Sequence, residues 1–211
     1  GSVDFGTQMR TKRELITEIA ATLSFSAIQN NDKIGVIFFS DKVEKYIPPQ
    51  KGRKHILYII RELLTFTPQG KKTDISEALE FMMKIQRRQC AAFVISDFID
   101  RHDLTDKLKI AGHRYDLNAI EVYDIRMKEL PDIGIVEFRD AETGHIEYVD
   151  TSSKRVRNQH RSAWQEREHT LHLQFTKAGV RNVAIPTDGN YVKKLMQLFN
   201  SKTAGISSKG N

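Results

Sequence analysis

Residues 91–98, with the sequence AAFVISDF, constrain the fold most strongly, because an apolar run with β-branched residues ends abruptly in an acid. Such a run predicts a buried strand with Asp97 at its carboxyl end. Ligands of open α/β sheets bind at the edge where the strands end. The carboxylate of Asp97 is therefore a candidate binding group.

A second candidate group lies upstream of this strand. Asp74 is followed three residues later by Glu77, the spacing of a capping box, so we expect Thr73 immediately before the amino terminus of a helix. Backbone N–H groups and the positive end of the helix dipole meet at such a point. The hydroxyl of Thr73 and the carboxylate of Asp97 are then expected to face one crevice.

Helical periodicity and apolar strand runs alternate along the chain. The helical stretches are residues 11–30, 56–64, 74–86, 104–112, 156–178 and 191–199, and the strand-like stretches are residues 33–39, 43–47, 91–96, 117–123, 133–139, 145–150 and 180–185. This alternation predicts crossover units, and so an α/β fold with a mainly parallel sheet and helices on both faces. The first helix has no strand before it, so one βα unit is expected to lack its first central strand.

Turn residues divide these stretches. Residues 33–47 are expected to form a β-hairpin that Pro48 and Pro49 close, and residues 140–144 are expected to turn a second, small hairpin. Gly112 is expected to cap the fourth helix, and Gly179 the fifth.

Composition sets the class of protein. With 211 residues, 39% of them hydrophobic and 28% charged, the chain is expected to form one soluble domain over residues 3–200, truncated at its amino terminus. Residues 201–211, rich in Ser, Lys and Gly, are predicted to be a disordered tail. Gly1 and Ser2 are either part of a natural fragment or a cloning scar, and the sequence leaves both open.

Charge and cysteine content exclude several classes of function. The net charge is +6, but acids and bases are interspersed, so the chain is not expected to bind nucleic acid. Cys90 is the only cysteine, which precludes an internal disulfide and a zinc site of several cysteines. No run reaches the roughly twenty apolar residues of a membrane helix, and no signal peptide is evident. We therefore expect a cytoplasmic segment without membrane contact.

Five blocks carry a family resemblance. Residues 12–15 (KREL), 25–41 (FSAIQNNDKIGVIFFSD), 47–49 (IPP), 72–75 (KTDI) and 95–100 (ISDFID) resemble, in this order, blocks of the bacterial domain-of-unknown-function 58 family, whose members are von Willebrand factor A-like. The similarity extends from Val3 to Phe199. It implies a Rossmann-like fold with a metal-ion-dependent adhesion site at the carboxyl edge of the sheet.

Three motifs build that site in the family. Thr73 matches the threonine that precedes a helix, and Asp97 matches the aspartate at the end of a later strand. The first motif, Asp-x-Ser-x-Ser, is missing, with Ser2 as its remnant and a provisional ligand. Mg²⁺ prefers oxygen ligands such as these hydroxyls and carboxylates. Because one matched carboxylate remains, this chain is expected to bind Mg²⁺ weakly or not at all.

The resemblance implies a non-enzymatic protein-interaction module that acts as a partner or adaptor of a MoxR-type AAA+ ATPase. An alternative from another class is a metal-dependent phosphohydrolase or nuclease that uses Asp97, Asp100 and Asp124. Asp97 and Asp74 can also serve simply as caps of the following turn and helix. No Gly-x-Gly-x-x-Gly, P-loop or Gly-x-Ser-x-Gly motif is present, so a nucleotide cofactor has no supporting residues.

Overall fold

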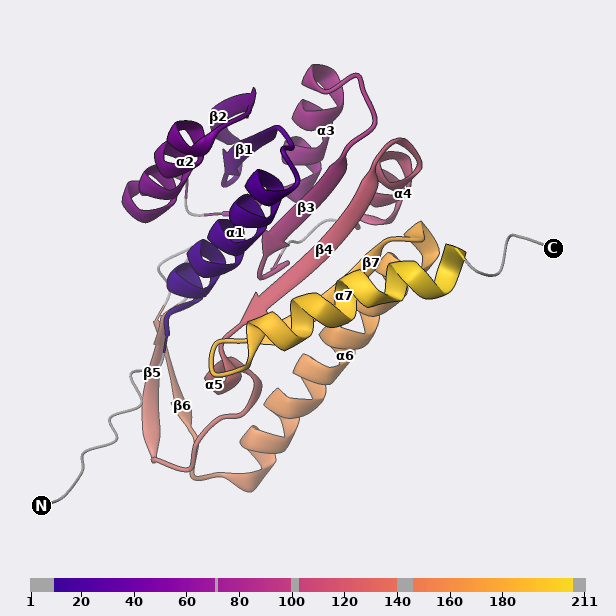
Figure 1. Cartoon of the computed structure of the whole chain (residues 1–211). Helices are drawn as coiled ribbons and strands as arrows, with labels where there is room; N and C mark the ends of the chain where they lie inside the picture. Colours follow the sequence, from indigo (N-terminus) through magenta and orange to yellow (C-terminus); the bar gives the residue numbers. More distant parts are fainter. Residues whose placement is uncertain (1–9, 71, 100–102, 140–145, 207–211) are drawn as a thin grey trace, which may run out of the picture.

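A parallel sheet forms the centre of the protein. The computed structural model describes residues 10–70, 72–99, 103–139 and 146–206 (Figure 1). Three parallel strands lie in the order β3 (Ala91–Ser96), β4 (Asp116–Tyr123) and β7 (Arg181–Pro186). Antiparallel pairs are formed by β1 (Ile34–Phe39) with β2 (Val43–Gln50), and by β5 (Ile135–Arg139) with β6 (Ile146–Asp150). The predicted α/β class and both predicted hairpins are confirmed.

Helices cover both faces of the parallel sheet. They are α1 (Lys12–Gln29), α2 (Arg53–Thr65), α3 (Ile75–Ile85), α4 (Thr105–Arg114), α5 (Ile125–Lys128), α6 (Lys154–Ala178) and α7 (Tyr191–Ile206). Alternate side chains of β4 point to opposite faces. Leu117 and Ala119 pack with residues of α3, α4 and α6, whereas Ile120 and Val122 pack with residues of α1 and α7, which cross the near face in Figure 1. Six consecutive buried residues in β4 are the result of this double cover.

The β1–β2 hairpin differs from its prediction at one end. Strand β2 continues through Pro48 and Pro49 to Gln50, whereas the sequence pattern places its end at Ile47. Proline is accepted in an edge strand, where its missing N–H breaks no ladder bond, and the register shifts between Ile34 and Val36 opposite the prolines. A Cβ at Gly35 would lie 2.8 Å from the Ile47 carbonyl oxygen, so this close approach needs glycine.

Two helix ends also differ. Gly112 lies inside α4, which ends at Arg114 with Tyr115 as its cap. A Cβ at Gly112 would lie 3.3 Å from Val180, so the glycine allows the helix to pack closely there. Helix α7 continues to Ile206, into the segment predicted to be a disordered tail, and residues 207–211 lie outside the described ranges. Gly179 caps α6 with φ 67°, as predicted.

Other expectations stay predictions. The described residues do not test two of them: the division of the chain at residue 200 and the missing central strand before α1. Within those residues, every helix is too short or too polar to cross a lipid bilayer.

Candidate functional site

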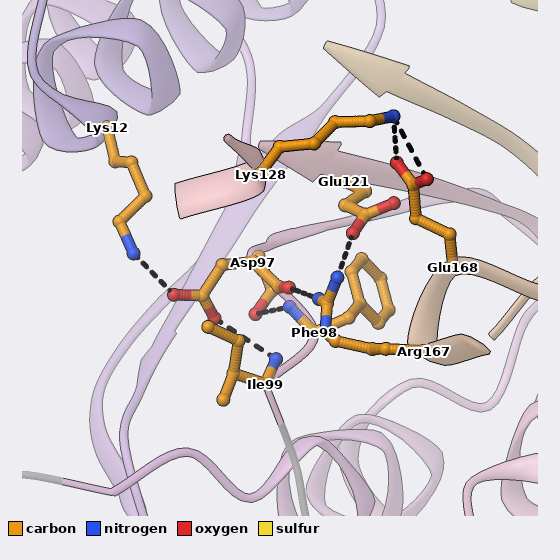
Figure 2. Close-up of polar contacts among 9 residues, drawn as sticks. Lys12, Asp97, Phe98, Ile99, Glu121, Lys128, Arg167 and Glu168 are labelled. Carbon is orange, nitrogen blue, oxygen red and sulfur yellow. Dashed lines mark hydrogen bonds and ion pairs between the residues drawn. The ribbon is translucent and has the colours of Figure 1, made fainter. Parts of the chain in front are cut away.

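Asp97 lies directly after β3, at the carboxyl edge of the parallel sheet. Its Oδ2 accepts a hydrogen bond of 2.8 Å from Nζ of Lys12, the first residue of α1, and its Oδ1 accepts one of 3.3 Å from the N–H of Ile99 (Figure 2). The side chains of Asp97 and Lys12 are 25% and 33% exposed. Both carboxylate oxygens therefore have donors, and the ammonium neutralises the carboxylate.

The residue after Asp97 fixes the direction of the chain. Phe98 has φ 50°, a left-handed conformation that costs a residue with a side chain about 1–2 kcal/mol. Its ring is buried and meets the ring of Phe175 edge to face at 5.2 Å, and its N–H donates to Oγ of Ser96. Burial of the aromatic ring offsets the cost of the left-handed backbone. The turn at Phe98 is thereby fixed and keeps Asp97 at the strand end.

Arg167 of α6 joins β3 to β4. Its guanidinium donates to the backbone oxygen of Asp97 at 2.5 Å and to Oε1 of Glu121 at 3.0 Å (Figure 2). It also lies over the buried ring of Trp164, 4.8 Å from the ring centre. One arginine thus fixes the loop after β3 relative to a carboxylate on β4.

Glu121 is a buried carboxyl group within an apolar strand. Burial raises its pKa, and the charge of Arg167 opposes that rise. Next to it, Nζ of Lys128 donates to both carboxylate oxygens of Glu168, at 2.9 and 3.0 Å, and this contact raises the pKa of Lys128. Three carboxylates at this edge therefore each have their own cation (Figure 2).

Thr73 lies beside the carboxyl end of β1. The following residue, Asp74, is the N-cap of α3: its Oδ1 accepts from the N–H of Glu77 at 2.9 Å, while its own N–H donates to the Ser40 backbone oxygen at 2.8 Å. Ile75 belongs to the same core cluster as Phe98. Thr73 and Asp97 thus precede residues that bury their side chains in one core.

Glu44 holds the loop that leads to Thr73. Its carboxylate accepts the backbone N–H groups of Gln69 and Gly70, at 2.9 and 3.0 Å, and the hydroxyl of Ser40. The bond from Ser40 contributes most to lowering the pKa of Glu44, followed by the two N–H groups. This carboxylate anchors the loop to the hairpin.

The oxygen ligands among the described residues do not by themselves fit a Mg²⁺ site. Ser2 lies outside the described residues, and both oxygens of Asp97 already have donors. No three His, Cys, Asp or Glu side chains among the described residues converge to hold an ion. Mg²⁺ is usually held by one or two carboxylates and several waters, and the one matched carboxylate described here is already engaged by Lys12 and Ile99.

The alternative enzyme site stays a prediction, because one of its three residues is not described. Asp100 lies outside the described residues, and Asp124 is the N-cap of α5, where it accepts from the N–H of Arg126 at 2.9 Å. Sequence reasoning missed Lys12 and Glu121. The signals were a capping box at Thr11 and Glu14 that places Lys12 at the helix start, and an acid within an apolar strand run.

Residues 1–170 match the family described as protein of unknown function DUF58. The chain belongs to this family. An uncharacterized protein of Mycobacterium tuberculosis is 32% identical over 147 residues, which are 69% of this chain and 46% of that protein. An uncharacterized protein of Mycobacterium avium is 27% identical over 161 residues, covering 75% of this chain and 95% of that protein. This DUF58 chain therefore spans about half the length of the first of these relatives.

Two solved structures share the fold. The conserved hypothetical protein BatB from Bacteroides thetaiotaomicron superposes with a TM-score of 0.52 at 18% identity, covering 90% of this chain and 88% of that one. An aerotolerance-related membrane protein from Bacteroides fragilis also gives a TM-score of 0.52, at 16% identity, covering 88% of each chain. At these identities the likeness concerns the fold alone.

Proposed function

We propose that this DUF58 chain is a non-enzymatic protein-interaction module, von Willebrand factor A-like, that docks its partner at the carboxyl edge of the parallel sheet. The observation that carries the proposal is the position of Asp97: a half-buried carboxylate at the strand end, held by Lys12 and by a fixed turn. The family resemblance supports a MoxR-type AAA+ ATPase as the partner. Cytoplasmic location, without nucleic acid or membrane contact, completes the proposal.

The ion pair of Lys12 and Asp97 places one positive and one negative charge side by side at this edge of the sheet. A partner that presents an acid beside a base can exchange with the pair, its acid meeting Lys12 and its base meeting Asp97. Such an exchange replaces one partly exposed pair by two, so it favours specificity and orientation over raw affinity. The metal site of this chain is incomplete in the proposal, and docking here does not pass through Mg²⁺.

The test compares binding with turnover. The chain is immobilised, and a purified MoxR-type AAA+ ATPase from the same organism is passed over it, with and without Mg²⁺. Asp97→Ala is expected to weaken binding about tenfold, as the loss of a half-buried charge at an interface does. Asp32→Ala is the matched control, because Asp32 is an exposed acid beyond the far end of α1.

The same proteins are assayed with p-nitrophenyl phosphate and with a plasmid, in Mg²⁺ and in Mn²⁺. The proposal expects no turnover. Hydrolysis that disappears in Asp97→Ala would replace the interaction module with the metal-dependent phosphohydrolase or nuclease. Equal binding by the Asp97→Ala and Asp32→Ala variants would place the partner surface elsewhere.

A further inference from the structure

Helix α2 carries a solvent-facing stripe of mixed apolar and cationic side chains. Its members recur at helical spacing, and we call them the α2 stripe: Lys54, Leu57, Tyr58, Arg61 and Leu64. The apolar side chains of Leu57 and Leu64 are 51% and 63% exposed. Buried residues of the same helix face inward instead, so the stripe is the outer face of an amphipathic helix.

The α2 stripe is hollowed between its side chains. Lys54, Leu57, Tyr58 and Arg61 line an open hollow of about 420 Å³. The guanidinium of Arg61 lies 5.4 Å from the ring centre of Tyr58, which holds the cation at one wall. A hollow with apolar sides and a cation at each end suits an apolar side chain flanked by carboxylates.

The cations in the first turn of α2 do not stabilise the helix itself. Its first turn contains Arg53 and Lys54 and no acid, and Gly52 at the N-cap offers no side-chain hydrogen bond. Cations at this end of a helix are unfavourable, because the backbone dipole is positive there. Glu62, the one acid of α2, forms an ion pair of 2.5 Å with Lys45, and its other carboxylate oxygen lies 3.8 Å from the guanidinium of Arg61. The outer face therefore carries an excess of cations, because the one carboxylate of the helix is already paired at the shorter distance with Lys45.

The helix is held in place from both ends. A guanidinium nitrogen of Arg13 donates to the backbone oxygens of Leu64 and Phe66, at 3.0 and 2.5 Å, and a ring nitrogen of His55 lies 2.9 Å from the Ile34 backbone oxygen. Helix α2 packs beside α1 and against the β1–β2 hairpin (Figure 1). A surface held in this way loses little entropy when a partner binds.

We propose that the α2 stripe is a docking site for an acidic amphipathic segment of a partner protein, whose apolar side chain enters the hollow while its carboxylates pair with Lys54 and Arg61. Charge complementarity selects this occupant over a second copy of the chain, because two copies would bring the same cations together. Arg61 lies between Tyr58 and Leu64 along the helix and interrupts the apolar surface that a lipid bilayer would bury. The site is separate from the Asp97 edge.

A designed peptide of about 18 residues, or five helical turns, serves as the probe. It carries Leu along one helical stripe with Glu on both sides, and a shuffled peptide of the same composition is its control. Binding to the whole chain is measured by fluorescence anisotropy. The stripe variant Lys54→Glu with Arg61→Glu and the variant Leu57→Ser are each expected to weaken binding by about tenfold or more.

Matched variants on α4 show whether the effect is local. Lys109→Glu and Ile110→Ser change an exposed cation and an exposed apolar residue of that helix, and they are expected to leave binding unchanged, as is Asp97→Asn. Equal binding of the shuffled peptide, or equal losses in the α4 variants, would overturn the proposal. Self-association in sedimentation equilibrium that Leu57→Ser abolishes would assign the stripe to a second copy. Binding to vesicles of phosphatidylcholine and phosphatidylserine in preference to the peptide would assign it to a membrane.

Discussion

Nζ of Lys12 lies 2.8 Å from Oδ2 of Asp97, although the two residues are 85 positions apart in the chain. This contact ties the start of α1 to the end of β3. In a double-mutant cycle with Lys12→Met and Asp97→Asn, we expect a coupling energy of about 0.5–1 kcal/mol, the range for partly exposed ion pairs. Urea unfolding of the four proteins measures it. The coupling should shrink at high salt, and strictly additive effects would show that the pair contributes nothing to stability.

The same contact determines how the chain responds to Mg²⁺. An ion that binds only the folded state stabilises it by an amount that grows with the ratio of its concentration to its dissociation constant. With Asp97 engaged by Lys12 and Ile99, about 10 mM MgCl₂ should shift the melting temperature by less than about 1 °C. Differential scanning calorimetry with MgCl₂, and with NaCl at equal ionic strength, makes this measurement. A shift of several degrees that Asp97→Asn removes would show that the chain holds the ion after all.

The sequence predicts the parallel sheet well, because periodicity and length are local properties of the strands. Asp97 at the end of β3 and the N-cap role of Asp74 follow from the same local patterns. The side chains that contact these residues do not follow from local patterns. Lys12 and Arg167 reach Asp97 from helices distant in sequence, so their contacts depend on how the layers stack. No spacing rule in one sequence contains that information.

The boundaries that failed have physical reasons of their own. Pro48 and Pro49 stop a central strand, but β2 lies at an edge, where a missing N–H costs little. Glycine is a common helix cap, yet Val180 fills the space beside Gly112. Close packing rather than a turn therefore explains the glycine. In both cases tertiary neighbours decide what a local signal means.

Phe98 offers a test of strain at the strand end. Loss of its buried ring in Phe98→Ala should lower the free energy of unfolding by about 3–5 kcal/mol. Because its φ is 50°, Phe98→Gly should be no less stable than Phe98→Ala, since glycine relaxes the left-handed backbone. Phe175 is the control: it is helical, so Phe175→Gly should be about 1 kcal/mol less stable than Phe175→Ala. The same order at both sites would refute the strain.

Gly70 controls the loop that carries Thr73. A Cβ there would lie 2.8 Å from Cβ of Ser40 and closer still to the carboxylate of Asp41. Gly70→Ala should therefore destabilise the protein by about 1–3 kcal/mol, as overpacking does. Gly112→Ala makes the matched comparison, because its new Cβ meets Val180 at 3.3 Å and gains helix propensity, so stability should stay nearly unchanged. Thermal unfolding of both variants gives the answer, and an equal effect would mean that the Gly70 loop moves freely.

Glu121 makes stability depend on pH in an identifiable direction. Burial raises the pKa of its carboxyl group above the ordinary value of 4.5, with Arg167 opposing the rise. Between the ordinary and the raised pKa the folded state binds more protons than the unfolded state, so the free energy of unfolding falls as pH rises through this interval. Glu121→Gln removes that titration. The stability of the variant relative to the wild type should therefore increase from pH 4.5 upward and level off above the folded pKa.

Glu80 provides the comparison of opposite sign for the Glu121 experiment. Its hydrogen bond with Lys107 lowers its pKa below 4.5, so its contribution to stability is present above that value and is lost as pH falls through the folded pKa. Glu80→Gln should then differ from the wild type by a constant amount from pH 5 to 7.5, while Glu121→Gln changes as the pH rises. Urea unfolding followed by circular dichroism at each pH distinguishes them. A flat difference for Glu121→Gln would mean that Arg167 cancels the effect of burial, and Glu121 would then titrate like an exposed acid.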